Sequence, residues 1–325
     1  MGAKMRKSMI GVAAAVALSA GSVHAADQPV LRPVVYTPAP WVFEIGARYF
    51  YSTGKNWYDL YNDPTPAQLN SRLTYDGLHA HAGEVFFRAD SPSAIFVKGY
   101  YGGGSIQHGN TLYDEDFPPA VSPYSKTVSD TSGTLQYANV DLGYSFYDSR
   151  GLATSTPVRF GGFIGYHYWH EKVDAFGCTQ IANSTPCAVG STVVPTRAVG
   201  PGVLVVTEND TFNSFRVGGI ADIWFTPAWK LTVEAAYARV WQKALDTHYL
   251  TFGSDPTTAT GNGVQLEAIL SYQVTPLFNV GVGGRWWHFN TDGNEALFNQ
   301  LIKYQTERYG VFVQGSVKFG DNPPL

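Results

Sequence analysis

The stretch Tyr309-Gly310-Val311-Phe312-Val313-Gln314-Gly315-Ser316-Val317-Lys318-Phe319 decides the fold. From Tyr309 to Phe319 every second residue gives one face that is apolar apart from a single glycine, while Gln314, Ser316 and Lys318 lie on the other face. A period of two is typical of a β-strand that has one apolar and one polar face. The same alternation recurs along most of the chain, so the sequence predicts a protein built from many such strands.

About ten segments carry this pattern, and their boundaries are good to a few residues. Their polar faces are rich in glycine and in charges of both signs, and their apolar faces carry Tyr, Trp and Phe near the strand ends. The segments are residues 41–52, 72–88, 94–107, 134–147, 158–174, 212–225, 229–244, 264–274, 278–288 and 308–319.

An apolar face edged by aromatic residues is typical of a strand that faces lipid around a polar interior. No sheet edge can lie in hydrocarbon without leaving backbone N–H and C=O groups unpaired, so such a sheet must close. The sequence therefore predicts an all-β fold, a transmembrane antiparallel up-and-down barrel of about ten strands. A soluble β-sandwich, with its apolar faces turned inward, is the alternative.

The two ends of the chain are predicted to lie outside the barrel. Lys4, Arg6 and Lys7 precede a short apolar run that ends before Val23-His24-Ala25, so residues 1–25 are expected to be a signal peptide. Residues 26–40 are expected to form an N-terminal periplasmic segment, 41–319 the barrel and 320–325 a C-terminal tail. No later apolar run is long enough for a transmembrane helix.

The connectors between these segments alternate between short and long. Residues 90–93, 149–157, 226–228 and 275–276 are short, whereas 53–71, 108–133, 175–211, 245–263 and 289–307 are long. Outer-membrane barrels have short periplasmic turns and long extracellular loops. We therefore expect a bacterial outer-membrane protein whose five long loops meet at the extracellular end.

The net charge limits the possible partners, and the cysteines indicate a disulfide. The formal net charge is −4 and no long basic run occurs, so nucleic acid is an unexpected partner. The two cysteines, Cys178 and Cys187, lie in one predicted loop. In an oxidising compartment this favours a local disulfide over a reactive or metal-binding thiol pair.

Two of the predicted long loops carry candidate catalytic residues. Asp114 and Asp116 follow the third segment, and Asp246 and His248 follow the seventh. Residues two apart on a strand share a face, so Asp246 can orient His248 as a base, and the Asp114–Asp116 pair can hold a water. The spacing alone leaves two alternatives open, a solvated acidic rim and a Ca²⁺ or Mg²⁺ site that includes Glu115.

The whole predicted barrel resembles the omptin family, the ten-stranded outer-membrane proteases. The runs Asp114-Glu115-Asp116-Phe117 and Asp246-Thr247-His248-Tyr249 resemble the two catalytic runs of that family. Further similar stretches are Ser52-Thr53-Gly54-Lys55, Ser71-Arg72-Leu73-Thr74-Tyr75, Gly109-Asn110 and Leu135-Gln136-Tyr137-Ala138-Asn139. The resemblance implies that Asp114 and Asp116 bind and polarise a water, that His248 is the base and that Asp246 orients it.

The resemblance also implies binding partners, and this chain differs from the family at several positions. It implies peptide or protein substrates, outer-membrane lipid, a lipopolysaccharide requirement, and no metal or other cofactor. Family members that cleave between basic residues have pocket acids where this chain has Ala244 and Tyr58. These two replacements argue against a dibasic preference, and the lipopolysaccharide-binding residues have no clean match.

Several other residues are expected to be structural. The clusters 166–170 and 286–288 are interpreted as interfacial aromatic belts, and His79 and His81 as part of a polar lumen. Charged residues of the strands are expected to form ion pairs inside a narrow barrel, which disfavours a diffusion pore. They are Glu44, Arg48, Lys98, Asp141, Arg159, Arg216, Asp222, Glu234, Glu267 and Arg285.

Two function hypotheses follow. The leading one is an omptin-like, aspartyl-type endopeptidase that hydrolyses extracellular peptides at the barrel mouth. The alternative is a non-catalytic barrel for adhesion, surface recognition or membrane integrity.

Overall fold

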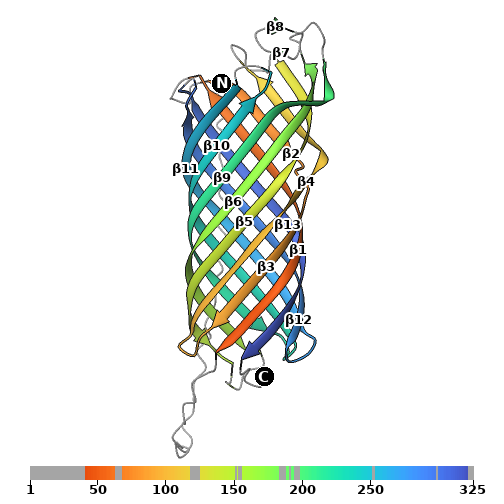
Figure 1. The fold of residues 1–325 in the computed structure, drawn as a ribbon. Helices are drawn as coiled ribbons and strands as arrows, with labels where there is room; N and C mark the ends of the chain where they lie inside the picture. The colour runs from red at the N-terminus through yellow and green to blue at the C-terminus, as the bar shows by residue number, and fades with distance from the viewer. Residues whose placement is uncertain are drawn as a thin grey trace, which may run out of the picture. The chain divides into compact units, whose positions relative to one another are not determined.

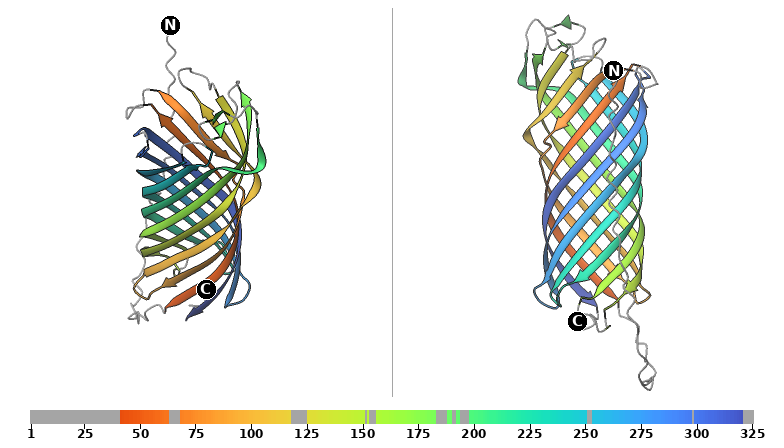
Figure 2. Two further views of the ribbon diagram at one scale, coloured as in Figure 1. Left: turned by 45° about the horizontal axis from the view of Figure 1, so that its top comes forward. Right: turned by 180° about the vertical axis from the view of Figure 1, so that it is seen from behind.

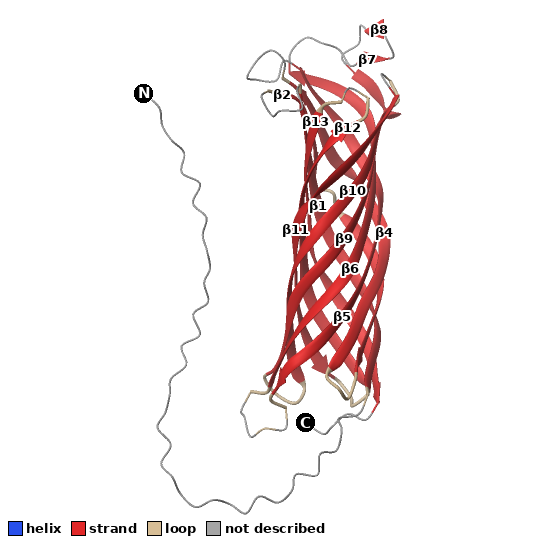
Figure 3. Ribbon diagram, turned by 90° about the vertical axis from the view of Figure 1, so that its left-hand side faces the viewer, coloured by secondary structure: helices blue, strands red, loops and turns tan. Residues whose placement is uncertain are grey.

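The computed structural model describes residues 41–62, 68–117, 125–150, 152, 156–182, 188–189, 192–193, 198–250, 253–297 and 299–320. The predicted signal peptide, the N-terminal segment up to residue 40 and residues 321–325 of the predicted tail lie outside these ranges. Strands are the only regular elements in the described part (Figure 3). No helix in it could cross a membrane.

Eleven strands form one antiparallel sheet, and two short strands form a separate hairpin (Figure 1). The sheet consists of β1 (Val42–Tyr61), β2 (Leu69–Asp76), β3 (Ala80–Asp90), β4 (Ile95–Asp116), β5 (Ser125–Asp148), β6 (Val158–Ala182), β9 (Ala198–Trp224), β10 (Trp229–His248), β11 (Gly253–Gln273), β12 (Phe278–Glu295) and β13 (Leu301–Gly320). The hairpin is β7 (Ala188–Val189) with β8 (Thr192–Val193).

The sheet closes on itself because β13 pairs with β1 (Figure 2). Both β2 and β3 lie between β1 and β4 and therefore share one place in the ring. Eleven strands with two in one place leave ten places, which confirms the predicted closed up-and-down barrel of about ten strands.

The break between β2 and β3 lies at Gly77, whose φ of 68° suits glycine. Next to it, β4 bulges between Ile106 and Asn110, with Gly109 at a φ of 90°. Backbone hydrogen bonds between Gly54 and Leu78, of 3.0 and 2.9 Å, carry the ring across the break. Above this point β2 and β4 continue in pairing to Asp116.

The predicted long loops are mostly strand. Residues 53–61, 108–116, 198–211, 253–263 and 289–295, for example, belong to strands that continue past the predicted segment ends. We call the end of the barrel where residues 62–68, 117–124, 183–197, 249–252 and 296–300 connect the strands the upper rim. The other end, with the short turns and with Val42 and Gly320, is the lower rim. The long connectors predicted from sequence were therefore wrong in extent, although all five lie at one end.

The outer wall between the lower rim and mid-height is apolar. Side chains that alternate along each strand are exposed there and give way to aromatic rings higher up. Members of this apolar band are Ile45, Val85, Leu142, Ile164, Val217, Val233, Leu266, Val282 and Val313, and its upper edge carries Tyr51, Tyr101, Tyr166, Tyr237 and Tyr309. Such a band with an aromatic girdle matches the lipid-facing surface of a membrane barrel.

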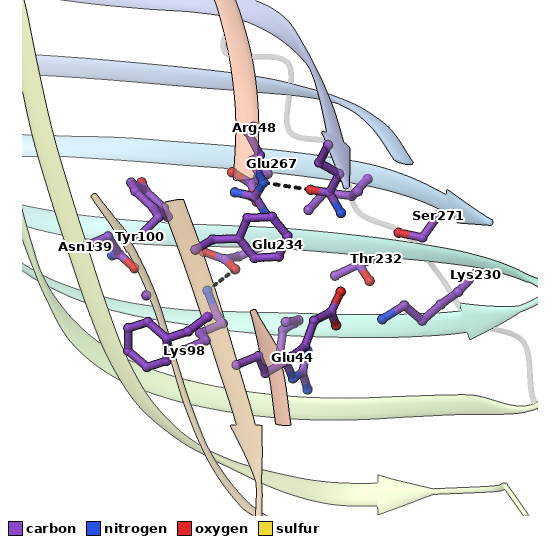
Figure 4. A pocket seen from close by; sticks show the side chains of 17 residues that line it. Glu44, Arg48, Lys98, Tyr100, Asn139, Lys230, Thr232, Glu234, Glu267 and Ser271 are labelled. Carbon is purple, nitrogen blue, oxygen red and sulfur yellow. Dashed lines mark hydrogen bonds and ion pairs between the residues drawn. The ribbon is translucent and has the colours of Figure 1, made fainter. Parts of the chain in front are cut away.

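The lower half of the lumen holds the predicted ion pairs. All ten charged residues named from the sequence take part, in pairs such as Arg48–Glu84 at 2.7 Å and Arg159–Asp222 at 2.6 Å. The other members form further ion pairs in this part of the lumen. A cavity of about 70 Å³ lies among them, and Arg48, Lys98, Glu234 and Glu267 point into it (Figure 4).

An aromatic septum fills the lumen above this network. It consists of Phe50, Tyr137, His167, Trp169, Phe212, Trp287, Phe289 and Phe312, all at most 2% exposed. Neighbouring rings are about 5 to 6 Å apart, as between Trp169 and Trp287 at 5.4 Å. Trp169 and Trp287 are therefore core residues. Their interpretation from the sequence as members of interfacial aromatic belts was wrong. The septum argues against a diffusion pore.

His79 and His81 also depart from the prediction. They lie on the outer wall beside the exposed rings of Tyr51 and Tyr49, where His81 contacts the hydroxyl of Tyr49. The expected place in the lumen was wrong because the chain leaves regular pairing at Gly77 to His79, which hides the alternation from a sequence pattern.

Candidate active site

The Asp–His pair lies at the upper end of β10. Asp246 and His248 are two residues apart and follow Ala244 and Gln242 on the inward face of the strand. The His248 Nε2 and Asp246 Oδ2 atoms are 2.8 Å apart, and the side chains are 16% and 25% exposed. The pair is therefore ordered by a charge-assisted hydrogen bond in a partly dry environment.

The carboxyl pair lies on β4. Asp114 is paired in register with Leu73 of β2, and Asp116 with Ser71. Both are half-buried and share the inward parity of Asn110 and Leu112. The bulge between Ile106 and Asn110 keeps this parity, so the two carboxyls stay on the lumenal side. The sequence placed these residues in loops, whereas the structure places them on strands, which hold side chains more rigidly.

The two pairs face each other across the mouth. Strands β4 and β10 are four places apart in one direction round the ring and six in the other, so they are nearly opposite. The charges of Asp114 and Asp116 act on His248, and that of His248 acts on both. The four residues proposed from the sequence therefore form one electrostatic unit.

The acid pair titrates in an unusual range. Burial, helped by the charge of Asp116, raises the pKa of Asp114 to about 7. Burial also raises the pKa of Asp116, and the charge of His248 offsets part of that rise. At neutral pH the pair can therefore hold a proton between two carboxyls that resist ionising together.

The pKa of His248 is also raised, but by charges and not by burial. Burial lowers the pKa of His248, but the charge and hydrogen bond of Asp246, together with Asp114 and Asp116, outweigh burial and hold the pKa above its usual value. A histidine whose protonated form is stabilised by a neighbouring carboxylate is suited to taking a proton from water.

The metal alternative does not fit this arrangement. Glu115 has the opposite parity to Asp114 and Asp116 and pairs with Lys126 at 3.0 Å. Within the described ranges, no group of three or more His, Cys, Asp or Glu residues is arranged to hold a metal ion. The three consecutive acids therefore do not converge on one cation.

Two further acids lie on the strand next to the Asp–His pair and were missed from the sequence. Glu208 and Asp210 lie on β9, where they are 2% and 1% exposed. Glu208 pairs in register with Asp246, and Asp210 with Ala244. The Tyr58 hydroxyl donates a hydrogen bond of 2.5 Å to Asp210. The signal was Glu208-Asn209-Asp210, two acids of one parity, but it lay in a predicted loop.

Cys178 lies in the upper part of β6 and is disulfide-bonded. Its predicted partner, Cys187, lies outside the described residues.

Comparison with known proteins supports the fold. No family model and no curated protein matches the chain. Among solved structures, the outer membrane protease OmpT from Escherichia coli superposes with a TM-score of 0.68 and 16% identity, covering 88% of this chain and 99% of that chain. At that identity the likeness shows a shared omptin-like barrel fold.

Two further solved structures match poorly. A TodX monoaromatic hydrocarbon channel mutant gives a TM-score of 0.25 at 9% identity, covering 87% of this chain and 91% of that chain. A FadL homologue from Pseudomonas aeruginosa gives 0.18 at 8% identity, with 86% and 90% covered. Neither score supports a shared architecture.

Proposed function

We propose that this chain is an outer-membrane endopeptidase that hydrolyses peptides at its upper rim with an activated water. The observation that carries the proposal is the convergence of a hydrogen-bonded Asp246–His248 pair and the Asp114–Asp116 pair on one lumen mouth. The omptin-like fold supports a peptide as the substrate, since the protease OmpT has the same architecture.

The chemistry needs no covalent intermediate. A water held by Asp114 and Asp116 gives a proton to neutral His248 as its oxygen attacks the carbonyl carbon of the scissile bond. Asp246 stabilises the imidazolium that forms. When the C–N bond breaks, His248 returns the proton to the leaving amine, the new carboxyl group loses the remaining water proton to that amine or to solvent, and both products depart. The imidazole is then neutral again.

The location proposed is the bacterial outer membrane, with the upper rim outside. The apolar band described above supports a bilayer around the lower half of the barrel, and the upper strands then project beyond it. We further propose lipopolysaccharide as a lipid partner, following the resemblance noted in the sequence. The peptide would approach from the extracellular side, because the aromatic septum blocks the lumen below.

The residues beneath the site support a preference other than dibasic sequences. Tyr58 is 2% exposed and donates to Asp210, and Ala244 lies beside Asp210 on the neighbouring strand. The tyrosine ring thus fills space that a substrate cation would need, and its hydroxyl engages the carboxyl of Asp210.

A digestion experiment tests the proposal. Refolded wild type, His248→Ala and Asp114→Asn are incubated with a peptide library in the presence of lipopolysaccharide, and products are identified by mass spectrometry. We expect the wild type to cleave and both variants to lose at least about a hundredfold in rate. Glu307→Gln is the matched control, since Glu307 faces outward toward His288 at 3.8 Å.

Equal cleavage by the wild type and both variants would exclude this site. No cleavage by the wild type would favour a non-catalytic surface barrel.

A further inference from the structure

Glu208 is a buried acid that the proposed chemistry does not use. It is 2% exposed on the inner wall of β9, and its Oε1 atom has no hydrogen-bond partner. A charged carboxylate in such a place is costly unless it is paired or protonated. The strongest electrostatic effects on it come from acids and none from a cation.

Glu208 is the middle member of a row of three carboxyls. Asp210 lies two residues further along β9, on the same face and within hydrogen-bond reach of Glu208. Asp246 lies opposite Glu208 in the register of β9 and β10. The Oδ1 atom of Asp246 is also buried without a hydrogen-bond partner, while its Oδ2 atom contacts His248.

The two outer members of the row each have hydrogen-bond partners other than carboxyls. Asp210 accepts hydrogen bonds from the Tyr58 hydroxyl at 2.5 Å and from Gln242 Nε2 at 2.7 Å. Asp246 has the protonatable His248 at 2.8 Å. Glu208 has neither kind of partner, so one proton on Glu208 removes both repulsions in the row, whereas a proton on either outer acid removes only one.

The surroundings of Glu208 agree with a neutral carboxyl. Burial, then Asp210 and Asp246, raise the pKa of Glu208 well above its usual range. Burial also raises the pKa of Asp210, to about 7, but the bonds from Tyr58 and Gln242 oppose that rise. Titratable groups that interact with Glu208 from the neighbouring strands are Asp246 of β10, Asp255 of β11, Tyr58 of β1, Tyr75 of β2 and Tyr304 of β13.

We propose that Glu208 is a protonated positioning residue: it donates to the carboxylate of Asp210, and its neutral carboxyl beside Asp246 keeps Asp246 in place for His248. The inference rests on the proposed function only in its consequence for catalysis. Glu208 does not touch the substrate. Its proton pairs Glu208 with Asp210 and removes a negative charge beside Asp246, so that Asp246 is not pushed away from His248.

The activity test compares two substitutions at Glu208. Glu208→Gln keeps an uncharged donor, so we expect its kcat/KM at neutral pH to stay within about twofold of the wild type, whereas Glu208→Ala should lose about tenfold, as for other partners that orient a functional histidine. The wild-type rate should fall at high pH as Glu208 loses its proton, and Glu208→Gln should extend the active range upward. Glu307→Gln controls for the loss of one acid elsewhere.

A second readout does not need activity. The infrared difference spectrum between wild type and Glu208→Gln at neutral pH should contain the C=O band of a protonated carboxylic acid. Absence of that band, or equal losses in Glu208→Gln and Glu208→Ala with an unchanged alkaline limit, would overturn the inference. If the wild type cleaves no peptide, the proposed function fails, and the infrared band still decides whether Glu208 is protonated.

Discussion

Replacement of Asp246 by asparagine perturbs the proposed site at its strongest contact. The His248 Nε2–Asp246 Oδ2 distance of 2.8 Å joins two side chains that are 16% and 25% exposed, so solvent screens their interaction only in part. A hydrogen bond to a charged group contributes about 1.5 to 3 kcal/mol, or about one to two pKa units. Since Asp246 is the main group that holds the pKa of His248 up against burial, the variant should have a lower pKa at His248.

The pH dependence of kcat/KM follows from the charge state of His248. The proposed base acts when His248 is neutral, so the wild-type kcat/KM should rise with pH through a pKa above the usual 6.5. In Asp246→Asn this acid limb should move down by about one to two units. The plateau should fall by about 10²- to 10⁴-fold, because the imidazolium formed during attack has lost its anion.

Two assays measure these quantities separately. The NMR titration of the His248 ring in detergent-folded protein gives its pKa, and the initial rates of peptide cleavage between about pH 5 and pH 9 give the limb and the plateau. An unchanged His248 pKa, or a limb that moves to higher pH, would refute the assignment of Asp246 as its partner.

Asp116→Asn should lower the pKa of Asp114 from about 7, since the neighbouring charge is gone, and lower kcat by at least about a hundredfold, as an NMR carboxyl titration and peptide cleavage would show. Arg308→Met leaves Glu171, whose carboxylate lies 2.6 Å from Arg308 and is 2% exposed, as an uncompensated buried charge; unfolding should show a loss of about 3 to 5 kcal/mol, and adding Glu171→Gln should restore most of it. On β12, Val282→Arg in the apolar band should cost about 2 to 4 kcal/mol in bilayer-refolding measurements, whereas Asn290→Arg above the band should cost about 0 to 1; equal costs would contradict the placement of the bilayer.

The lower half of the barrel could be predicted because the residue pattern of each strand there reflects what its two faces contact. Lipid on one side and the ion-pair network on the other impose a clean period of two, as in Tyr309 to Phe319. The lumenal charges were identified for the same reason, since a charge within an apolar alternation has only the interior to face.

The upper half could not be predicted from local pattern. The stretch Gly253 to Gly263 contains Ser, Asp, Pro and Thr and has the composition of a loop, yet it is strand throughout. Above the apolar band both faces of the wall meet water or polar groups, so alternation in hydropathy disappears. Long-range pairing with β10 and β12, which no local pattern reports, keeps this stretch extended.

Local sequence pattern also failed to predict the aromatic septum and the two buried acids of β9. Trp286 and Trp287 are neighbours of identical type, and only strand parity places one outside and one in the core. Glu208 and Asp210 show the parity of a strand, but they were placed in a loop because the strand's beginning was set too late. The candidate catalytic runs at 114–116 and 246–248 were found through their spacing and their family resemblance, and the order of the strands in the barrel places them nearly opposite each other.

A crystal structure that shows ordered water at the upper rim tests the central claim most directly. One water should lie about 2.6 to 3.2 Å from the His248 ring and at the same distance from Asp114 or Asp116. A gap between the histidine and both aspartates wider than a single water can bridge, about 6 Å, would contradict water activation by these residues.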